Sequence, residues 1–388
     1  MHGFQRTLGL AAAVTLSACA PPTVAPSAPA SVPPASMATP AWTRADLPIA
    51  VEGVFGGNLP ADVVRFADQL IAVGAVNGGC CDGSFDPVTR ALVWASSDGL
   101  AWTLAPEAES LQLGRMLGVA TNGRHLVAIG IVDRPRAGHP GEKIPVAATW
   151  TSADGVTWQR SPDAPEFGSI AGSAAGFVAA PGGGTAPEAW WSETGEDWEQ
   201  VATTTAMGAG TIDRLVHTST GFVAVGGSDG VAAVWTSADG RTWDRVADQA
   251  AFAGGRMLDV AEREGRFVAV GEGPEGESAL IWLSEDARTW RRLELLDGGA
   301  NDLRLTRVIA TEAGFLAIAT YYGDVGREIR VFASADGTDW QAADPASGLG
   351  DAELHLAAWT AFGDGVVVAV GDRWDRELGA VPVTWLIR

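Results

Sequence analysis

Short apolar runs of about five residues recur along the chain, about forty to fifty-five residues apart, and glycine borders most of them. Runs of this length and character predict strands that are buried on both faces of a sheet. The runs are "LIAVG" (70–74), "LVAIG" (126–130), "FVAAP" (177–181), "FVAVG" (222–226 and 267–271), "FLAIA" (315–319) and "VVAVG" (367–371). Another strand pattern precedes each run, as in "RMLGVATNG", across a turn that contains glycine. The interval is that of a four-stranded propeller blade.

A second phrase, S-x-D-G-x-x-W or a variant of it, follows six of these seven runs, each time after a strand that carries an aromatic residue. Its Asp is placed to accept hydrogen bonds from the backbone amides just ahead, its Gly tolerates a positive φ, and its Trp folds back as an apolar plug. Calcium takes six to eight oxygens, so one carboxylate per turn predicts a structural role. Thr194 replaces the Asp in one copy and Ala287 replaces the Gly in another. The predicted turn residues are Asp98, Asp154, Asp239, Asp286, Asp336, Trp102, Trp158, Trp198, Trp243, Trp290 and Trp340.

The last repeat stops at Arg388 with its third strand, and the missing fourth strand is found at the other end of the chain. There "AWTRADLP" (41–48) resembles "TWDRVADQ", the fourth-strand phrase of another repeat. Pairing of these ends closes the ring and removes exposed sheet edges. The sequence therefore predicts an all-β, seven-bladed β-propeller of four-stranded blades, closed by its N-terminal strand on the C-terminal blade. The predicted blades are approximately 63–107, 114–163, 168–204, 211–249, 255–295, 304–345 and 354–388 plus 41–48.

The phrase S-x-D-G-x-x-W resembles the Asp-box, or BNR, repeat of sialidase-like and related propellers, and the resemblance covers nearly all of 41–388. This chain lacks the usual spacer between Asp and Gly, which makes the turn one residue tighter. The resemblance implies that the turns lie at outer corners, away from a ligand face. In sialidase-like enzymes it also implies an arginine cluster, a Tyr/Glu nucleophile pair and an Asp acid/base. Tyr321 or Tyr322 with Glu328 matches that pair, but the two tyrosines are adjacent and no FRIP-like segment precedes the Asp phrases.

The N-terminal end is typical of an exported protein. Residues 1–18 combine Arg6, a short apolar segment and small residues before Cys19, which predicts a signal peptide. "LSAC" resembles the bacterial lipobox, which implies cleavage before Cys19 and lipidation of its thiol; an ordinary signal peptide is the alternative. Residues 20–40 are uncharged and rich in Pro, Ala and Ser, which predicts a disordered tether from residue 19 to residue 40. We therefore expect a protein anchored by lipid in the bacterial cell envelope.

Composition narrows the classes of ligand. The net charge of −21 argues against nucleic acid, because phosphates require basic patches. Cys80 and Cys81 are adjacent, and in an oxidising compartment they are candidates for a vicinal disulfide; two reduced thiols are the alternative. No second Cys/His pair accompanies them, so neither a metal nor a cofactor is predicted. We expect a monomer.

Candidate ligand-binding residues lie in the connections between the second and third strands of the blades, which vary most between repeats. They are Arg134, Arg136, His139, Tyr321, Tyr322, Arg373 and Trp374. The alternative is that these residues are solvated loop tips. Cations near the innermost strands suggest a second candidate, a positive funnel in the central channel, although their offsets differ. These cations are Arg65, Arg115, Arg214, Arg256, Arg307 and His355.

The sequence supports a binding protein better than an enzyme. It contains no G-x-S-x-G elbow, and its 47 acidic residues do not single out a catalytic pair. The preferred hypothesis is a membrane-anchored, non-catalytic propeller that binds a protein or an envelope component through its loop face. The alternative is an exo-acting, sialidase-like glycoside hydrolase. Paired arginines beneath an apolar rim would favour the binder, and three arginines converging near a Tyr/Glu pair would favour the enzyme.

Overall fold

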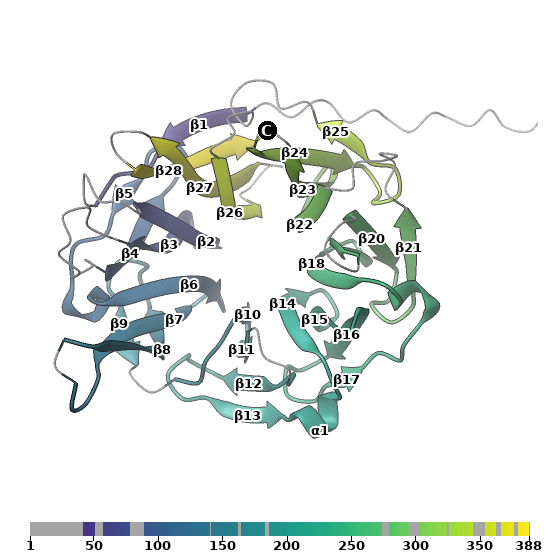
Figure 1. The fold of residues 1–388 in the computed structure, drawn as a ribbon, viewed down its shortest axis with the longest axis horizontal. Helices are drawn as coiled ribbons and strands as arrows, with labels where there is room; N and C mark the ends of the chain where they lie inside the picture. Colours follow the sequence, from purple (N-terminus) through teal and green to yellow (C-terminus); the bar gives the residue numbers. More distant parts are fainter. Residues whose placement is uncertain are drawn as a thin grey trace, which may run out of the picture. The chain divides into compact units, whose positions relative to one another are not determined.

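The structure, a computed structural model, describes residues 42–50, 57–77, 89–139, 141–161, 164–182, 186–273, 279–294, 303–323, 326–343, 354–361, 366–375 and 379–387. All of them belong to one compact unit, Met37–Arg388. Within this unit, seven four-stranded antiparallel sheets are arranged in a ring (Figure 1). The predicted seven-bladed β-propeller is therefore confirmed.

Each blade runs outward from the centre of the ring through strands A, B, C and D (Figure 1). The A strands are β2 (Asn58–Phe66), β6 (Gly114–Thr121), β10 (Ser169–Ser173), β14 (Thr211–Thr218), β18 (Arg256–Arg263), β22 (Leu303–Thr311) and β26 (Leu354–Ala361). The B strands are β3 (Gln69–Asn77), β7 (Leu126–Pro135), β11 (Gly176–Ala180), β15 (Gly221–Ser228), β19 (Arg266–Glu272), β23 (Gly314–Gly323) and β27 (Val367–Asp375). These B strands contain the recurrent apolar runs.

The outer half of each blade is shorter in most cases. The C strands are β4 (Thr89–Ser96), β8 (Lys143–Ser152), β12 (Ala189–Ser192), β16 (Val231–Ser237), β20 (Ala279–Ser284), β24 (Gly326–Ser334) and β28 (Gly379–Ile387). The D strands are β5 (Thr103–Leu104), β9 (Gln159–Ser161), β13 (Glu199–Ala202), β17 (Asp244–Arg245), β21 (Trp290–Glu294), β25 (Gln341–Ala343) and β1 (Trp42–Asp46). We number the blades 1 to 7 from β2 onward, so blade 7 consists of β26, β27, β28 and β1.

The ring closes through β1, which is the outermost strand of blade 7 (Figure 1). β1 pairs antiparallel with β28, with Trp42 opposite Ile387 and Asp46 opposite Val383. The pairing continues past the strand, because the Leu47 amide donates to the Pro382 carbonyl at 3.0 Å. The predicted closure by the N-terminal strand is thus present in the structure.

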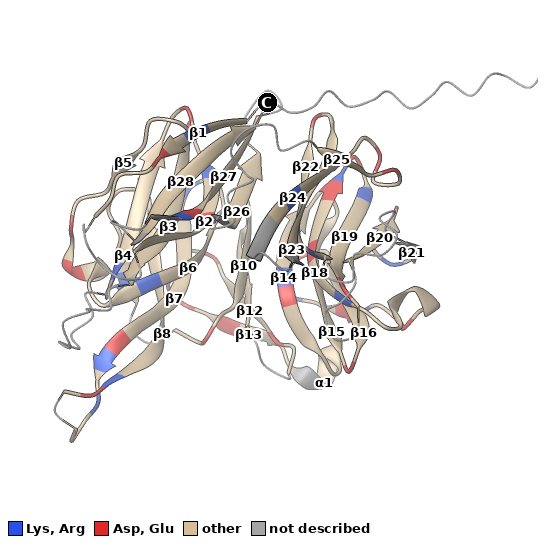
Figure 2. Ribbon diagram, turned by 45° about the horizontal axis from the view of Figure 1, so that its top comes forward, with Lys and Arg blue, Asp and Glu red and all other residues tan. Residues whose placement is uncertain are grey.

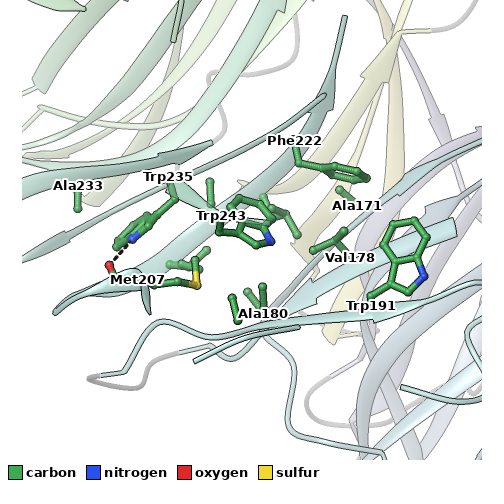
Figure 3. Packing of buried hydrophobic residues seen from close by; sticks show 14 residues of the cluster. Ala171, Val178, Ala180, Trp191, Met207, Phe222, Ala233, Trp235 and Trp243 are labelled. Carbon is green, nitrogen blue, oxygen red and sulfur yellow. Dashed lines mark hydrogen bonds between the residues drawn. The ribbon is translucent and has the colours of Figure 1, made fainter. Parts of the chain in front are cut away.

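The hydrophobic core lies between the blades, because both faces of each sheet are covered by neighbouring sheets. The buried apolar residues of the described segments form seven clusters, and each cluster is drawn from two adjacent blades. Figure 3 shows the cluster between blades 3 and 4, where Trp235, Val178 and Phe222 are all buried. Every blade therefore depends on both of its neighbours for burial.

The aromatic residue of strand C holds the connection that leads into its own blade. Trp235 is fully buried, and its indole donates to the Met207 carbonyl at 2.8 Å (Figure 3). Met207 ends the short helix α1 (Thr204–Met207), which precedes blade 4. The equivalent bonds join Trp94 to Pro48, Trp150 to Ser110 in the 3-10 turn Glu109–Leu111, and Trp282 to Ala251 in the 3-10 turn Ala250–Phe252. These bonds hold the D–A connections against the buried indoles of strand C.

The S-x-D-G-x-x-W phrase forms a tight turn between strands C and D. In blade 4, Asp239 Oδ1 accepts hydrogen bonds from the amides of Arg241 and Thr242, each at 2.8 Å. The Trp243 indole donates to the Gly240 carbonyl at 3.1 Å, which folds the ring back over the turn. Gly240 has a φ of 77°, and a Cβ there would lie 2.5 Å from Val178 of blade 3. The turn glycine is therefore required both by its backbone conformation and by the neighbouring blade.

The same arrangement recurs around the ring. Carboxylate-to-amide bonds are made by Asp98, Asp154, Asp286 and Asp336, and indole-to-carbonyl bonds are made by Trp102, Trp158, Trp198, Trp290 and Trp340. The two variant copies keep the turn. Thr194 accepts one long bond of 3.4 Å from Glu196, while the Ser192 hydroxyl still accepts from the Gly195 amide at 2.8 Å. Ala287 adopts the left-handed φ of 57° that glycine adopts elsewhere.

We expect Asp239→Asn to destabilise the protein at pH 7 by about 0.5–1 kcal/mol, because a neutral acceptor replaces a charged one at a largely exposed site. The amides of Thr242 and Arg241 lower the pKa of Asp239 below its ordinary value of 3.8. Since the folded pKa lies below the unfolded one, this stabilisation is complete above pH 4 or so and is lost as the pH falls through the folded pKa. Urea unfolding at pH 7 and at progressively lower pH measures it. A difference between the two proteins that persists in strong acid would contradict the assignment.

Candidate functional site in the central channel

Two cavities lie along the axis of the ring. The one that we call the channel cavity has a volume of about 440 Å³ and is lined by A-strand residues of all seven blades. The other, the mouth cavity, has a volume of about 580 Å³. Its lining residues come from the first halves of β2, β6, β22, β24 and β26, from the second half of β3 and from the middle of β23. The mouth cavity is therefore at the face where the D–A and B–C connections lie, opposite the aspartate turns.

A β-bulge in the A strands directs side chains into the channel. The register against strand B shifts by one residue in every A strand except β10 among those described. The extra residues are Ala61, Leu117, Asp213, Leu258, Thr306 and Ala357. A bulge leaves a backbone amide without a ladder partner and changes the direction of its side chains. The channel is lined where these six bulges meet.

Carboxylates beside the bulges accept hydrogen bonds from backbone amides of their own blade and of the next one. Asp62 of blade 1 accepts from its neighbour Val63 at 2.9 Å and from Val119 of blade 2 at 3.0 Å. Asp259 of blade 5 makes the equivalent pair of bonds to Val260 at 2.9 Å and to Val308 of blade 6 at 3.0 Å. Between blades 3 and 4 a hydroxyl replaces the carboxylate, because Ser169 Oγ accepts from the Leu215 amide at 2.9 Å. Each side chain joins its blade to the next one.

Two arginines balance these carboxylates. Nε of Arg214 lies 3.3 Å from Oδ1 of Asp259, and Arg307 of the next blade lines both cavities. The pKa of Asp62 is raised, because burial disfavours its charged form more than Arg214, the peptide amides and Arg307 favour it. Arg214 keeps about a third of its side-chain surface accessible (34%) because it faces the channel. The channel is thus a mixed-charge environment.

The predicted funnel of cations is only partly assembled. Of its six members, Arg214 and Arg307 line the channel cavity, and Arg115 lines the mouth cavity, where it pairs with Asp133 at 3.2 Å. Arg256 pairs with Asp213 of blade 4 through two hydrogen bonds. Arg65 makes an interaction of its own, and the side chain of His355 lies outside the described residues. Acidic partners accompany the arginines, because the A strands carry both signs of charge.

The candidate loop residues lie at the mouth face but in three different blades. Arg136 pairs with Glu142 at 2.8 Å, and His139 lies 3.8 Å from the same carboxylate, within the β7–β8 hairpin. That hairpin extends beyond the neighbouring strands (Figure 2). Arg134 also lies in β7 and makes an interaction of its own. None of these three residues lines either cavity.

The other loop candidates lie in blades 6 and 7. Tyr321 and Tyr322 belong to β23, where their backbones are opposite Glu328 and Arg327 of β24. Arg373 lies in β27, 3.9 Å from Asp46 of β1, where it reinforces ring closure. Trp374 follows it in the same strand, opposite Ala380. The described side chains of these blades that reach the mouth cavity are Thr306, Arg307, Ile318, Thr320, Ile329 and Ala357.

Three predicted positions lie outside the described residues, namely Cys19, Cys80 and Cys81. Among the residues that the structure describes, no group of three or more His, Cys, Asp and Glu side chains is arranged to hold a metal ion. In the same part of the chain, no helix has both the length and the apolar character needed to cross a membrane.

Neither Asp62 nor Asp259 is among the site residues predicted from the sequence. A recurring position in the A strands could have revealed both residues. When the A strands are aligned on the B strands that they pair with, Asp62, Arg214, Asp259 and Arg307 occupy one position, opposite Val73, Val225, Val270 and Ile318. In each case an apolar residue follows directly. Charged residues that recur at one position of the innermost strands, each followed by an apolar residue, indicate a lined channel.

No protein-family model matches the sequence, and no curated protein matches it. Among solved structures, YCF48 bound to D1 peptide is similar with a TM-score of 0.54 and 14% identity, over 89% of this chain and 94% of that one. A protein of unknown function from Dyadobacter fermentans has a TM-score of 0.51 and 13% identity, over 89% and 97%. A mutant Trypanosoma rangeli sialidase has a TM-score of 0.47 and 12% identity, over 89% and 58%. The similarity is one of fold.

Proposed function

We propose that this chain is a non-catalytic binding propeller, exported and anchored by lipid at Cys19, that binds a protein or envelope component at its mouth face. The observation that carries the proposal is the combination of paired arginines with an apolar opening. Arg115 is paired with Asp133 and Arg214 with Asp259. The mouth cavity, which Arg115 helps to line, is otherwise lined mainly by apolar side chains, which include Leu59, Pro60, Met116, Leu117, Ile318 and Ile329.

Apolar lining with a few polar groups is typical of a site that binds by burial of surface. Hydrolysis of a sialoside in the manner of sialidase-like enzymes needs several arginines directed at one carboxylate. Here the charges of Arg115 and Arg214 are already partly neutralised by Asp133 and Asp259. The fold neighbour whose structure contains a bound peptide supports a peptide or protein partner, by analogy of fold alone.

The N-terminal sequence supports the proposed export and lipid anchoring. The segment Leu16-Ser17-Ala18-Cys19 and the uncharged stretch 20–40 match a lipidated cysteine followed by a tether. Two acyl signals anchor a protein stably where one chain gives only reversible binding. On such a tether the propeller is held away from the membrane surface, with its mouth face free to meet a partner.

One observation favours the alternative, an exo-acting sialidase-like hydrolase. The backbones of Tyr321 and Glu328 are directly opposite each other in neighbouring strands, so the fold keeps the two members of a Tyr/Glu pair close in the chain's backbone. Turnover of a fluorogenic sialoside that is lost in Tyr321→Phe would establish this alternative and overturn the non-catalytic proposal.

We expect affinity capture from solubilised envelope to return one protein or envelope component that requires the mouth face. The test variant carries Ala at Arg134, Arg136, Tyr321, Tyr322 and Trp374. The matched control carries Ala at Val156, Glu264 and Arg288, which are exposed on the opposite face. Loss of capture in the test variant alone supports the proposal. Equal capture by both variants places the partner elsewhere, and capture of nothing contradicts a binding role.

A further inference from the structure

The two cavities are parts of one passage. Ala61, Leu117, Arg307 and Ala357 line both of them. Leu117 is 53% exposed although it lies inside the ring, so a large apolar side chain faces open space at the junction. The passage therefore changes along its length, from the apolar mouth cavity to the charged channel cavity.

At the junction the carboxylates are engaged in hydrogen bonds, whereas the arginines are largely not. Both oxygens of Asp62 and both oxygens of Asp259 already accept backbone amides. A guanidinium has five donors, and the hydrogen bond of Arg307 within the described residues goes to the Thr306 carbonyl at 3.0 Å. Nε of Arg214 is buried and, despite its proximity to Asp259, lacks hydrogen-bond geometry. Arg307 and Arg214 thus have donors to spare at the junction, which suits an anionic ligand.

The charge of that anion is limited by its surroundings. Asp213 and Glu262 line the channel cavity in addition to the two bulge carboxylates. A phosphate group carries a charge of about −1.5 to −2 near neutral pH and would be repelled by four acidic neighbours. A carboxylate carries one charge and matches the planar fork of a guanidinium. The size of the mouth cavity, about 580 Å³, is within the range of small-molecule sites.

We propose that the passage binds a small amphipathic carboxylate. Its apolar body lies in the mouth cavity against Leu117, and its carboxylate is bound by Arg307 with Arg214 behind it. Two kinds of ligand carry such a carboxylate, a free aliphatic acid and the C-terminal residue of a peptide. The site is independent of the proposed function, because it requires no protein partner and is tested on the protein alone.

Calorimetric titration with octanoate and with N-acetyl-leucine tests the proposal, and octanol, octylamine and acetate serve as controls. We expect at least one of the two amphipathic acids to bind, and the tighter one identifies the source. Affinity should fall at least about tenfold in Arg307→Gln and stay unchanged in Arg288→Gln, a matched exposed arginine on the opposite face. Equal binding of octanol or octylamine, binding that Arg307→Gln leaves unchanged, or no binding of either acid would each overturn the proposal.

A second variant guards against loss of folding in Arg307→Gln. Leu117 is exposed, so Leu117→Asp removes little burial and adds a negative charge at the junction of the cavities. We expect Leu117→Asp to unfold at a temperature close to that of the wild type and to abolish binding of both acids. Binding of octanoate to Leu117→Asp with wild-type affinity would place the ligand outside the passage and refute the assignment.

Discussion

Replacing Trp235 with alanine is expected to lower the free energy of unfolding by about 3–5 kcal/mol, the usual cost of removing a fully buried aromatic side chain. The indole is completely buried between blades 3 and 4, and it also donates to the Met207 carbonyl. Its loss leaves a cavity and releases the connection into blade 4. Urea unfolding followed by circular dichroism measures the change.

Trp235→Phe is the matched control. Phenylalanine keeps most of the apolar volume and loses only the indole N–H, so we expect a cost of about 1–2 kcal/mol. Phenylalanine already occupies the corresponding position of blade 6, as Phe332. If the two substitutions were equally damaging, the hydrogen bond rather than packing would account for the stabilisation.

Replacing Asp259 with alanine is expected to cost about 3–5 kcal/mol, as removal of one partner from a buried ion pair usually does. The carboxylate is 3% exposed and holds the amides of Val260 and Val308. Without it, two buried amides lose their acceptor and Arg214 loses its nearest anion. Thermal and urea unfolding of Asp259→Ala measure the loss.

Asp213→Ala is the control for this prediction. Asp213 also pairs with an arginine, but its side chain is 18% exposed, against 4% for Asp259, and that of its partner Arg256 is 42% exposed. Exposed ion pairs contribute about 1 kcal/mol or less, so we expect a small change. Adding Arg214→Met to Asp259→Ala should recover part of the loss, because it removes the partly buried charge that has lost its nearest anion. Equal destabilisation by the two single variants would show that the inter-blade bonds of Asp259 contribute little.

The corners of the blades were predictable because they are local. The interactions of Asp239, Gly240 and Trp243 are confined to a few consecutive residues, so each corner leaves its own signature in the sequence. Ring closure was predictable for the same reason, since the phrase around Trp42 matches a fourth strand. The repeat then dictates the number of blades.

The channel was harder to predict because its residues are brought together only by closure of the whole ring. Asp62 and Val119 belong to different blades, and the bulge shifts each side chain by one position relative to a regular strand. The loop candidates show the opposite error, because residues that stand out in the sequence are already paired in the structure. Arg136 is conspicuous in sequence as a cation in an acidic chain, but a neighbour in its own hairpin, Glu142, already pairs with it.

Closure by β1 has a consequence for biosynthesis. Trp42 is among the first residues of the propeller to be made, and its partner Ile387 belongs to β28, the last of its strands to be made. Until β28 has been made, blade 1 lacks its neighbour on one side, and the apolar surface that faces blade 7 stays open to water. Contacts between such distant positions form slowly, because a long loop must close first. A nascent chain of this design therefore needs protection from aggregation until its final strand has emerged.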